Sequence, residues 1–305
     1  MTRHLRVDPT TGRRVILAPE RLRRPGAGDP VGLPNVPACR CPFCPGHEAA
    51  TTPTIAQQPA DGPWAARAFA NGFPALLVEG DPAGAHEVIV EVPEHDLMVW
   101  QGSPERLVPP LKLARDRMRD LSGDQRFAHF AWFRNHGIRA GSSQAHPHAQ
   151  LVALPYVPDA VQRMVAHCVP DRFPRLIERA EADDRIVWQG QHILALCPFA
   201  PMYPFETWLV PTSGSPDFRD ADDMVLTDLA LAMHHVLGAM AEQLSELAYC
   251  AALFTRPVGY DTPGLAWHIR VQPRPEIHSG FSAATGDSIN GVMPELAAHL
   301  LRTQS

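Results

Sequence analysis

Hydrophobic and polar residues alternate along several short segments in the first half of the chain. Between Glu87 and Val92, a valine stands at every second position, which predicts a strand with one buried face. Similar segments, each bounded by proline, glycine or polar residues, predict strands over 69–77, 126–135 and 149–154. The first 64 residues are rich in Pro, Gly and Arg and predict loops with a short hairpin.

Helical periodicity replaces this alternation in three places. Residues 105–121 predict a helix, with Pro109 and Pro110 near its start, where proline is tolerated. Residues 220–247 carry a long apolar helical pattern, and residues 159–184 predict a helical connection between the two halves of the chain.

The second half of the chain repeats the plan of the first, with predicted strands over 192–197, 206–210, 251–255 and 268–271. Pro93 and Pro211 each follow a predicted strand and are 118 residues apart, and His148 and His268 are 120 residues apart. Nearly equal offsets predict two tandem α+β halves, with antiparallel sheets and helices packed on them. We place the halves at 1–170 and 171–305; with only two copies, coincidence is the alternative.

Composition limits the classes of function. The 305 residues are 45% hydrophobic and 20% charged, with a net charge of −6 and no block of like charge, which is typical of a globular protein without general affinity for nucleic acid or membranes. No apolar run follows the N-terminus as in a signal peptide, and no stretch approaches a membrane span in length, so we expect a cytoplasmic protein. Lys112 is the only lysine, so phosphate groups must be held by Arg, His, hydroxyl, amide or backbone groups.

The segment His146-Pro147-His148-Ala149-Gln150 carries the clearest candidate chemistry. Side chains two apart on a strand point to the same face, so both imidazoles and the Gln150 amide share one side. Imidazole can act as a metal ligand, base or nucleophile near neutral pH. The alternative is an ordinary pair of surface or core histidines.

Cys41 and Cys44 have the spacing with which two thiolates reach one metal ion. A tetrahedral site needs two more ligands, and His146 and His95 are the candidates, which would complete a closed, structural Cys₂His₂ set for Zn²⁺. Cys39 is closer to Cys41 and geometrically poorer. The alternative is a pair of reduced thiols without metal.

Further motifs extend along most of the chain, and together the chain resembles the galactose-1-phosphate uridylyltransferase family, the nucleotidyltransferase branch of the histidine-triad superfamily. The matching segments are 6–9, 19–25, 41–46, 69–76, 135–150, 204–207 and 284–290. The resemblance implies two histidine-triad-like halves, a place in galactose or other carbohydrate metabolism, a nucleotide sugar and a sugar 1-phosphate as substrates, and a homodimer.

The family's functional residues map onto this sequence one by one. The resemblance implies that His148 is the nucleophile of a covalent histidine–nucleotide intermediate and that Gln150 contacts its phosphate. Nucleotide or phosphate contacts map to Asn71, Asn135, Ser142, Ser143, Arg21 and Arg24. The zinc ligands map to Cys41, Cys44, His95 and His146.

Gln150 favours transfer over hydrolysis, because many hydrolytic relatives have a third histidine at this position. A sugar phosphate, whose second pKa is about 6, leaves without a general acid. The resemblance therefore predicts movement of a nucleoside monophosphate, with UMP preferred, between a nucleotide sugar and a sugar 1-phosphate. The alternatives are a nucleotidyl phosphorylase acting on ADP-glucose or diadenosine polyphosphates, and a zinc-stabilised nucleotide-binding module without turnover.

Two departures from the family pattern limit these expectations. Ala266 stands where a second-half histidine is expected beside His268, so a second metal site is incomplete. Ser282 stands where uridylyltransferases carry a sugar-binding glutamate, which weakens the expectation of galactose 1-phosphate as the acceptor.

Overall fold

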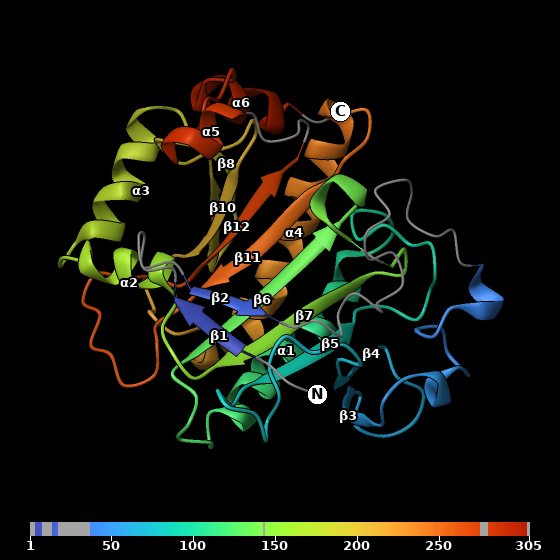
Figure 1. Ribbon diagram of the computed structural model, residues 1–305. Coiled ribbons are helices and arrows are strands. Elements are labelled where there is room, and N and C mark those ends of the chain that lie inside the picture. Colours follow the sequence, from blue (N-terminus) through green and yellow to red (C-terminus); the bar gives the residue numbers. More distant parts are fainter. Residues whose placement is uncertain (1–3, 8–13, 18–36, 143, 275–279, 304–305) are drawn as a thin grey trace.

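A single antiparallel sheet of ten strands runs through the computed structural model, which describes residues 4–7, 14–17, 37–142, 144–274 and 280–303 (Figure 1). In spatial order the strands are β3 (Thr54–Gln58), β4 (Ala66–Ala70), β5 (Ala85–Val90), β7 (His148–Leu154), β6 (His129–His136), β11 (Tyr249–Phe254), β12 (His268–Pro273), β10 (Thr207–Pro211), β9 (Ile193–Leu196) and β8 (Ile186–Gln189). Strands β1 (His4–Val7) and β2 (Arg14–Leu17) pair as the short hairpin expected near the N-terminus.

The helices cover the two faces of the sheet unequally (Figure 1). They are α1 (Val108–Leu121), α2 (Asp159–Ala166), α3 (Arg172–Ala182), α4 (Asp223–Gln243), α5 (Gly280–Thr285) and α6 (Pro294–Arg302). Helices α1 and α4 lie behind the sheet in this view, whereas α2 and α3 pack on the opposite face near β9 and β10.

The strand order is symmetric about the pairing of β6 with β11, and matching strands pair in matching register. Val88 on β5 faces Gln150 on β7, and Trp208 on β10 faces Arg270 on β12, each pair 120 residues from its counterpart. The fold is therefore the expected α+β arrangement of two histidine-triad-like halves. The pairing of Arg134 with Ala251 joins their half-sheets into one, and the boundary between residues 170 and 171 stays a prediction.

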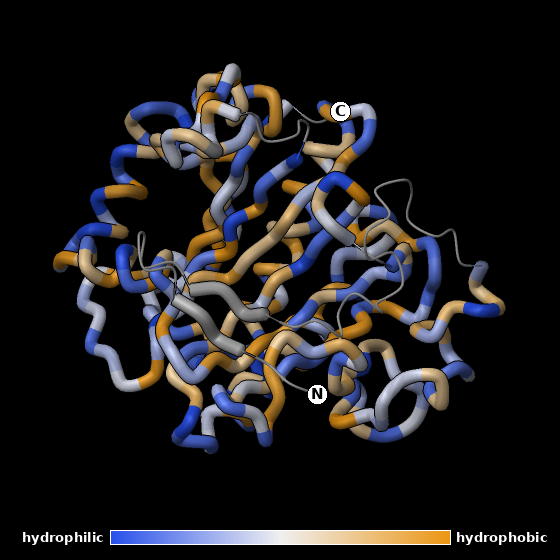
Figure 2. The backbone as a smooth tube through the Cα atoms, in the orientation of Figure 1, coloured by the Kyte–Doolittle hydropathy of each residue, from blue (hydrophilic) through white to orange (hydrophobic). Residues whose placement is uncertain are grey.

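Residue parity decides which side chains enter the core. Odd-numbered residues of β7 and β12, such as Leu151 and Ile269, and even-numbered residues of β6, such as Trp132, pack with α1 and α4 in one continuous hydrophobic core. The Arg117 guanidinium of α1 holds the buried Glu87 carboxylate by two hydrogen bonds of 2.7 and 2.8 Å, which fixes the helix to β5. Hydrophobic segments follow the central strands, and hydrophilic ones gather at the outer loops (Figure 2).

Several boundaries differ from the sequence-based expectations. The strand predicted over 69–77 ends at Ala70, because the Asn71 Oδ1 accepts a hydrogen bond from the Phe73 backbone N–H at 2.8 Å and turns the chain before Pro74. The helix predicted from residue 105 begins as a 3-10 helix, Pro104–Leu107, and becomes α-helical at Val108. Strands β3 and β8 and helices α5 and α6 were not predicted.

Helix α4 corrects one expectation about length. It has 21 residues, and by length and composition it is long and apolar enough to cross a membrane. The sequence-based statement that no stretch approaches such a length is therefore wrong. Most of this apolar stretch is buried inside the protein, where Leu229, Val236 and Leu237 pack into the core.

Candidate active site and metal centre

Two glycines shape the connection that leads from β6 to β7. Gly137 and Gly141 both have a φ of 79°, in the left-handed region where glycine is favoured, and they flank the 3-10 helix Ile138–Ala140. A Cβ at residue 137 would also lie 2.8 Å from the Ala248 side chain. The chain then passes Gln144 and enters β7 at His148.

The His148 ring is held by its own strand. Its Nδ1 donates a hydrogen bond to the His146 carbonyl oxygen at 2.9 Å. Because a carbonyl can only accept, the proton of the neutral ring lies on Nδ1 and the lone pair lies on Nε2. Burial lowers the pKa of His148 to about 4, and the positive charge of Arg134 acts in the same direction. The ring is 7% exposed and lies edge-on to Phe43.

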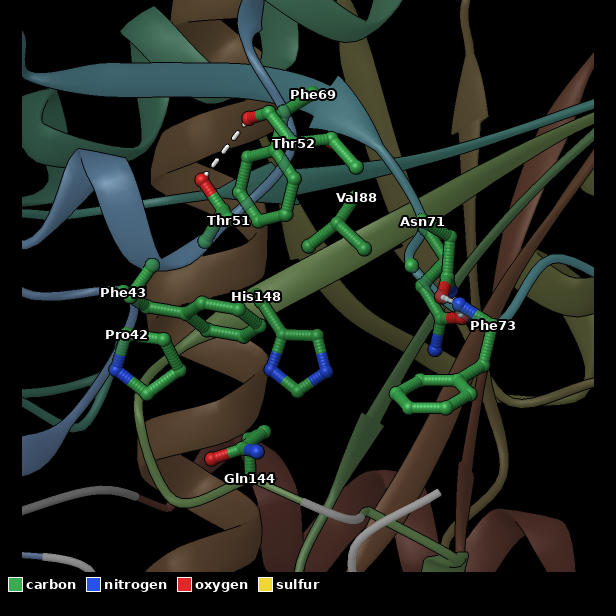
Figure 3. Close-up of a pocket in the computed structure, with 13 residues that line it drawn as sticks. Pro42, Phe43, Thr51, Thr52, Phe69, Asn71, Phe73, Val88, Gln144 and His148 are labelled. Carbon is green, nitrogen blue, oxygen red and sulfur yellow. Dashed lines mark hydrogen bonds between the residues drawn. The ribbon is translucent and has the colours of Figure 1, made fainter. Parts of the chain in front are cut away.

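A cavity of about 490 Å³ opens beside this ring, so there is room for a phosphoryl group (Figure 3). Phe43 lies on one side of His148 and Phe73 on the other. Aromatic and other apolar side chains make up most of the wall, which suits a planar base and a ribose. The polar side chains in the wall are Thr51, Thr52, Asn71, Gln144, His148 and Gln150.

The orientation of the Gln150 amide follows from a chain of hydrogen bonds. The Ala75 backbone N–H donates to His86 Nδ1 at 2.9 Å, so the proton of the neutral His86 ring lies on Nε2. That Nε2 donates to Gln150 Oε1 at 2.8 Å. The Asn71 amide nitrogen contacts the same oxygen at 3.5 Å, while Asn71 Oδ1 is held by Phe73. The Gln150 oxygen is thus occupied, and its N–H₂ group is the donor left for the cavity.

A compact cluster of four metal-ligating side chains lies next to the His148 strand. One ligand atom each from Cys41, Cys44, His95 and His146 lies within 4.8 Å of every other. The His146 Nε2 donates to the Val92 carbonyl oxygen at 2.8 Å, which leaves its Nδ1 free as a ligand. Cys39 is exposed and outside the cluster.

The cluster has the dimensions of a tetrahedral site. His146 Nδ1 lies 3.7 Å from Cys41 Sγ and 3.6 Å from Cys44 Sγ, and His95 Nδ1 lies 3.4 Å from Cys44 Sγ. A tetrahedral zinc ion with ordinary Zn–S and Zn–N bonds separates sulfur from nitrogen by about 3.6 Å. Burial and the neighbouring Cys41 raise the pKa of the Cys44 thiol to about 11, so the thiolate form calls for a cation. The residues present therefore fit a metal ion.

Of the predicted catalytic and contact residues, five lie in the described part of the chain, and three of these five line the cavity. Asn71, His148 and Gln150 line it. Asn135 follows Arg134, which pairs with Ala149 on the neighbouring strand, and its side chain does not line the cavity. The Ser142 hydroxyl donates to the Gln144 carbonyl oxygen at 2.8 Å, away from the cavity. Ser143, Arg21 and Arg24 lie outside the described residues.

His86, Phe43 and Gln144 also contribute to this region and were not singled out from the sequence. His86 shares its strand face with Val88 and Val90, so the alternation that predicts the strand also placed it toward the cavity. Gln144 stands two residues before His146 in the motif region. Phe43 lies between Cys41 and Cys44, and nothing in its sequence position predicted a contact with His148.

An antiparallel sheet that presents two histidines and a glutamine on one face, beside a cavity, suits nucleotidyl transfer, and the comparisons place the chain among nucleotidyltransferase enzymes. No family model matches it. It is 29% identical to the ADP-glucose phosphorylase of Arabidopsis thaliana over 99% of this chain and 93% of that protein. It is 25% identical to the galactose-1-phosphate uridylyltransferase of Thermotoga maritima over 77% of this chain and 83% of that protein.

Solved structures agree with these relationships. The crystal structure of the Arabidopsis thaliana ADP-glucose phosphorylase with bound ADP-glucose matches with a TM-score of 0.81 and 28% identity, over 100% of this chain and 99% of the other. A uridylyltransferase structure matches with a TM-score of 0.81 at 24% identity over 98% of this chain and 97% of the other, which shows the shared fold. Over most of its length the chain is therefore similar to ADP-glucose phosphorylase and to the galactose-1-phosphate uridylyltransferases.

Proposed function

We propose that the protein transfers a nucleoside monophosphate through a covalent intermediate on His148. The Nε2 lone pair attacks the α-phosphorus of a nucleoside diphosphate sugar, the bond to the bridging oxygen breaks, and the sugar 1-phosphate leaves. In the second half-reaction, a phosphate oxygen of the acceptor attacks the same phosphorus and releases the ring. The observation that carries this proposal is the His148 ring, fixed by the His146 carbonyl with its free nitrogen beside a cavity.

Gln150 steadies the phosphoryl group in this proposal. Its N–H₂ group donates to a non-bridging oxygen, and His86 and Asn71 hold the amide in that orientation by occupying its oxygen. An amide has no acidic proton to give to the leaving group, which agrees with a phosphate leaving group that needs none. His86 is therefore a positioning residue that acts through Gln150.

ADP-glucose is the donor and orthophosphate the acceptor that the observations favour. The relative that matches 99% of this chain is an ADP-glucose phosphorylase, whereas the uridylyltransferase from Thermotoga maritima matches 77%. Ser282, half-buried on α5, also lacks the carboxylate expected to bind galactose. The products would be glucose 1-phosphate and ADP.

A second candidate is the transfer of UMP between UDP-glucose and galactose 1-phosphate. It was the first expectation from the sequence, and several galactose-1-phosphate uridylyltransferases at 24–27% identity support it.

Zn²⁺ is the metal proposed for the cluster of Cys41, Cys44, His95 and His146. Two thiolates and two imidazoles at tetrahedral separations form a closed set, so the ion would organise structure and leave no position for a reacting water. It would tie the cysteine knuckle to the loop after β5 and to the start of β7.

The remaining expectations extend this proposal. Arg21, Arg24, Asn135, Ser142 and Ser143 would contact phosphates or nucleotide in the substrate complex. A homodimer in the cytoplasm is the proposed working form, as the resemblance to the uridylyltransferases implies.

The donor is tested by release of sugar 1-phosphate from ADP-glucose and from UDP-glucose, each with orthophosphate or galactose 1-phosphate as acceptor. We expect multiple turnovers with ADP-glucose and orthophosphate and none for His148→Ala. Turnover with UDP-glucose and galactose 1-phosphate alone would assign the second candidate. No release from either donor would overturn the proposed function.

A further inference from the structure

A second cavity opens on the same face of the sheet, in the second half of the molecule. It has a volume of about 290 Å³ and is lined by residues of α2, α3, β10 and β12 and of the segment between the two helices. The side chains in its wall that bear on its chemistry are Arg163, His167, Arg172, Trp208, His268 and Arg270. The proposed reaction uses none of them.

This cavity occupies the place in the second half that the nucleotide cavity occupies in the first. His268 and Arg270 stand on β12 as His148 and Gln150 stand on β7, in the same register against their neighbouring strands. The backbone geometry is also repeated, because His268 Nδ1 donates to the Ala266 carbonyl oxygen at 3.0 Å as His148 Nδ1 does to His146.

The second histidine cannot act as a nucleophile. His268 is fully buried, and its Nε2 accepts a hydrogen bond from Arg270 Nε at 3.1 Å. The ring is also stacked on Trp208, with a centroid distance of 4.7 Å, and on Phe254 at 5.3 Å. Both ring nitrogens are engaged, so this cavity is suited to binding and not to group transfer.

Among the described residues, Arg270 forms no ion pair with a carboxylate. Its guanidinium lies over the rings of Phe254 and Trp208, 3.9 and 4.3 Å from their centroids. Glu206 is the acid whose charge acts on it, but both Glu206 oxygens accept hydrogen bonds elsewhere, from the Met202 backbone at 2.8 Å and Trp208 Nε1 at 3.0 Å. A half-buried guanidinium held in this way still has its terminal N–H groups available for an anion.

The charge around Arg270 is one-sided. Arg163 and Arg172 contribute two more guanidinium groups from α2 and α3, and no aspartate or glutamate is among the described residues that line the cavity. Neither arginine belongs to an ion pair found among the described residues, although the chain as a whole has a net charge of −6. Three arginine side chains in the lining of one concave site with apolar walls fit a phosphate group on a small organic body.

We propose that this cavity is a second ligand site, which binds a small phosphate monoester such as a hexose phosphate or a nucleoside monophosphate. Arg270 holds the phosphate from the sheet, Arg163 and Arg172 hold it from the helices, and the apolar wall contacts the organic body. The site does not depend on the proposed function of His148, because the two cavities are lined by different residues.

The test is calorimetric titration of the full-length protein with AMP and, separately, with glucose 6-phosphate. Both titrations are done in about 0.15 M KCl, which screens weak binding to surface charges. The double variant Arg163→Ser/Arg172→Ser removes two cations from exposed helical positions. Arg175→Ser, on α3 but outside the cavity wall, is the matched control. Nucleotide labelling of His148 is measured in parallel.

We expect wild type and Arg175→Ser to bind one of the two probes with the same affinity, and the double variant to bind that probe at least tenfold more weakly. His148 labelling should be the same in all three proteins. The preferred probe identifies the organic body. The proposal would be overturned if the double variant bound both probes as tightly as wild type. It would also be overturned if wild type bound neither probe outside the nucleotide cavity. Loss of His148 labelling with intact binding of the second ligand would count against the proposed function alone.

Discussion

At the scale of single residues, the site depends on which atom of each polar group carries a proton. Backbone groups decide this for both histidines, since a carbonyl accepts from His148 Nδ1 and a backbone N–H donates to His86 Nδ1. The sequence motif could predict that His148 and Gln150 share a face. It could not predict the tautomers or the role of His86, because those depend on contacts between residues far apart in the chain.

Removal of the His86 contact tests the orientation of Gln150. In His86→Phe, the Gln150 amide is free to rotate, so we expect labelling of His148 by the donor to slow by about 10- to 100-fold, from a loss of about 1–3 kcal/mol, with little change in KM. His86→Gln, which can both accept from Ala75 and donate to Gln150, should recover part of the rate. Equal labelling rates in wild type and His86→Phe, in proteins of equal Tm, would contradict this role.

At the scale of elements, the sequence predicts helices and strands that are long enough to show a hydrophobic period, and it does not predict the short edge strands. The alternation around Val88 and the long apolar period of α4 each extend over enough residues to identify the element. The strands Thr54–Gln58 and Ile186–Gln189 have five and four residues and lie at the sheet edges, so too few positions reveal a period. The metal cluster was predicted from spacing because ligand types are chemically restrictive, although its four residues come from three separate segments.

Loss of one ligand should detach the cysteine knuckle from the sheet. For His146→Ala we expect loss of bound Zn²⁺ and a fall in the free energy of unfolding of several kcal/mol, because metal binding contributes directly to folding. Elemental analysis and urea unfolding measure the two effects. Cys39→Ser is the control, since Cys39 is exposed and outside the cluster. Full zinc content in His146→Ala would refute the ligand assignment.

At the scale of the whole molecule, two half-sheets share one core, and both present their strand histidines on the face opposite α1 and α4. The division of roles between the halves follows from the residue two positions after each histidine. Gln150 is bonded to His86 and not to His148, which agrees with the proposed reaction at His148, whereas Arg270 occupies the ring nitrogen of His268. The sequence offsets predicted the duplication but not the continuous sheet, which depends on backbone pairing between β6 and β11.

Burial of neutral histidines in this core should make stability depend on pH. Burial lowers the pKa of His129 to about 4 and that of His268 to about 3, from an ordinary value of 6.5. Below pH 6.5 the unfolded chain binds protons that the folded protein does not, so stability is lost as pH falls from 6.5 toward 4. Each histidine adds a slope of about 1.4 kcal/mol per pH unit.

Urea unfolding at several pH values, with Zn²⁺ in excess, measures this slope. His129→Gln removes one titrating group and should reduce the slope by about 1.4 kcal/mol per pH unit below pH 6.5. Identical slopes for wild type and His129→Gln would show that His129 is not buried in its neutral form.

The central claim is that His148 carries the nucleotide during turnover. Wild-type protein incubated with ADP-glucose or UDP-glucose, without acceptor, is digested at alkaline pH, where phosphoramidates survive, and its peptides are sequenced by tandem mass spectrometry. The account predicts a nucleoside monophosphate on His148 that disappears when orthophosphate or a sugar 1-phosphate is added. A nucleotide attached to any other residue, or turnover without an adduct in a rapidly quenched sample, would contradict it.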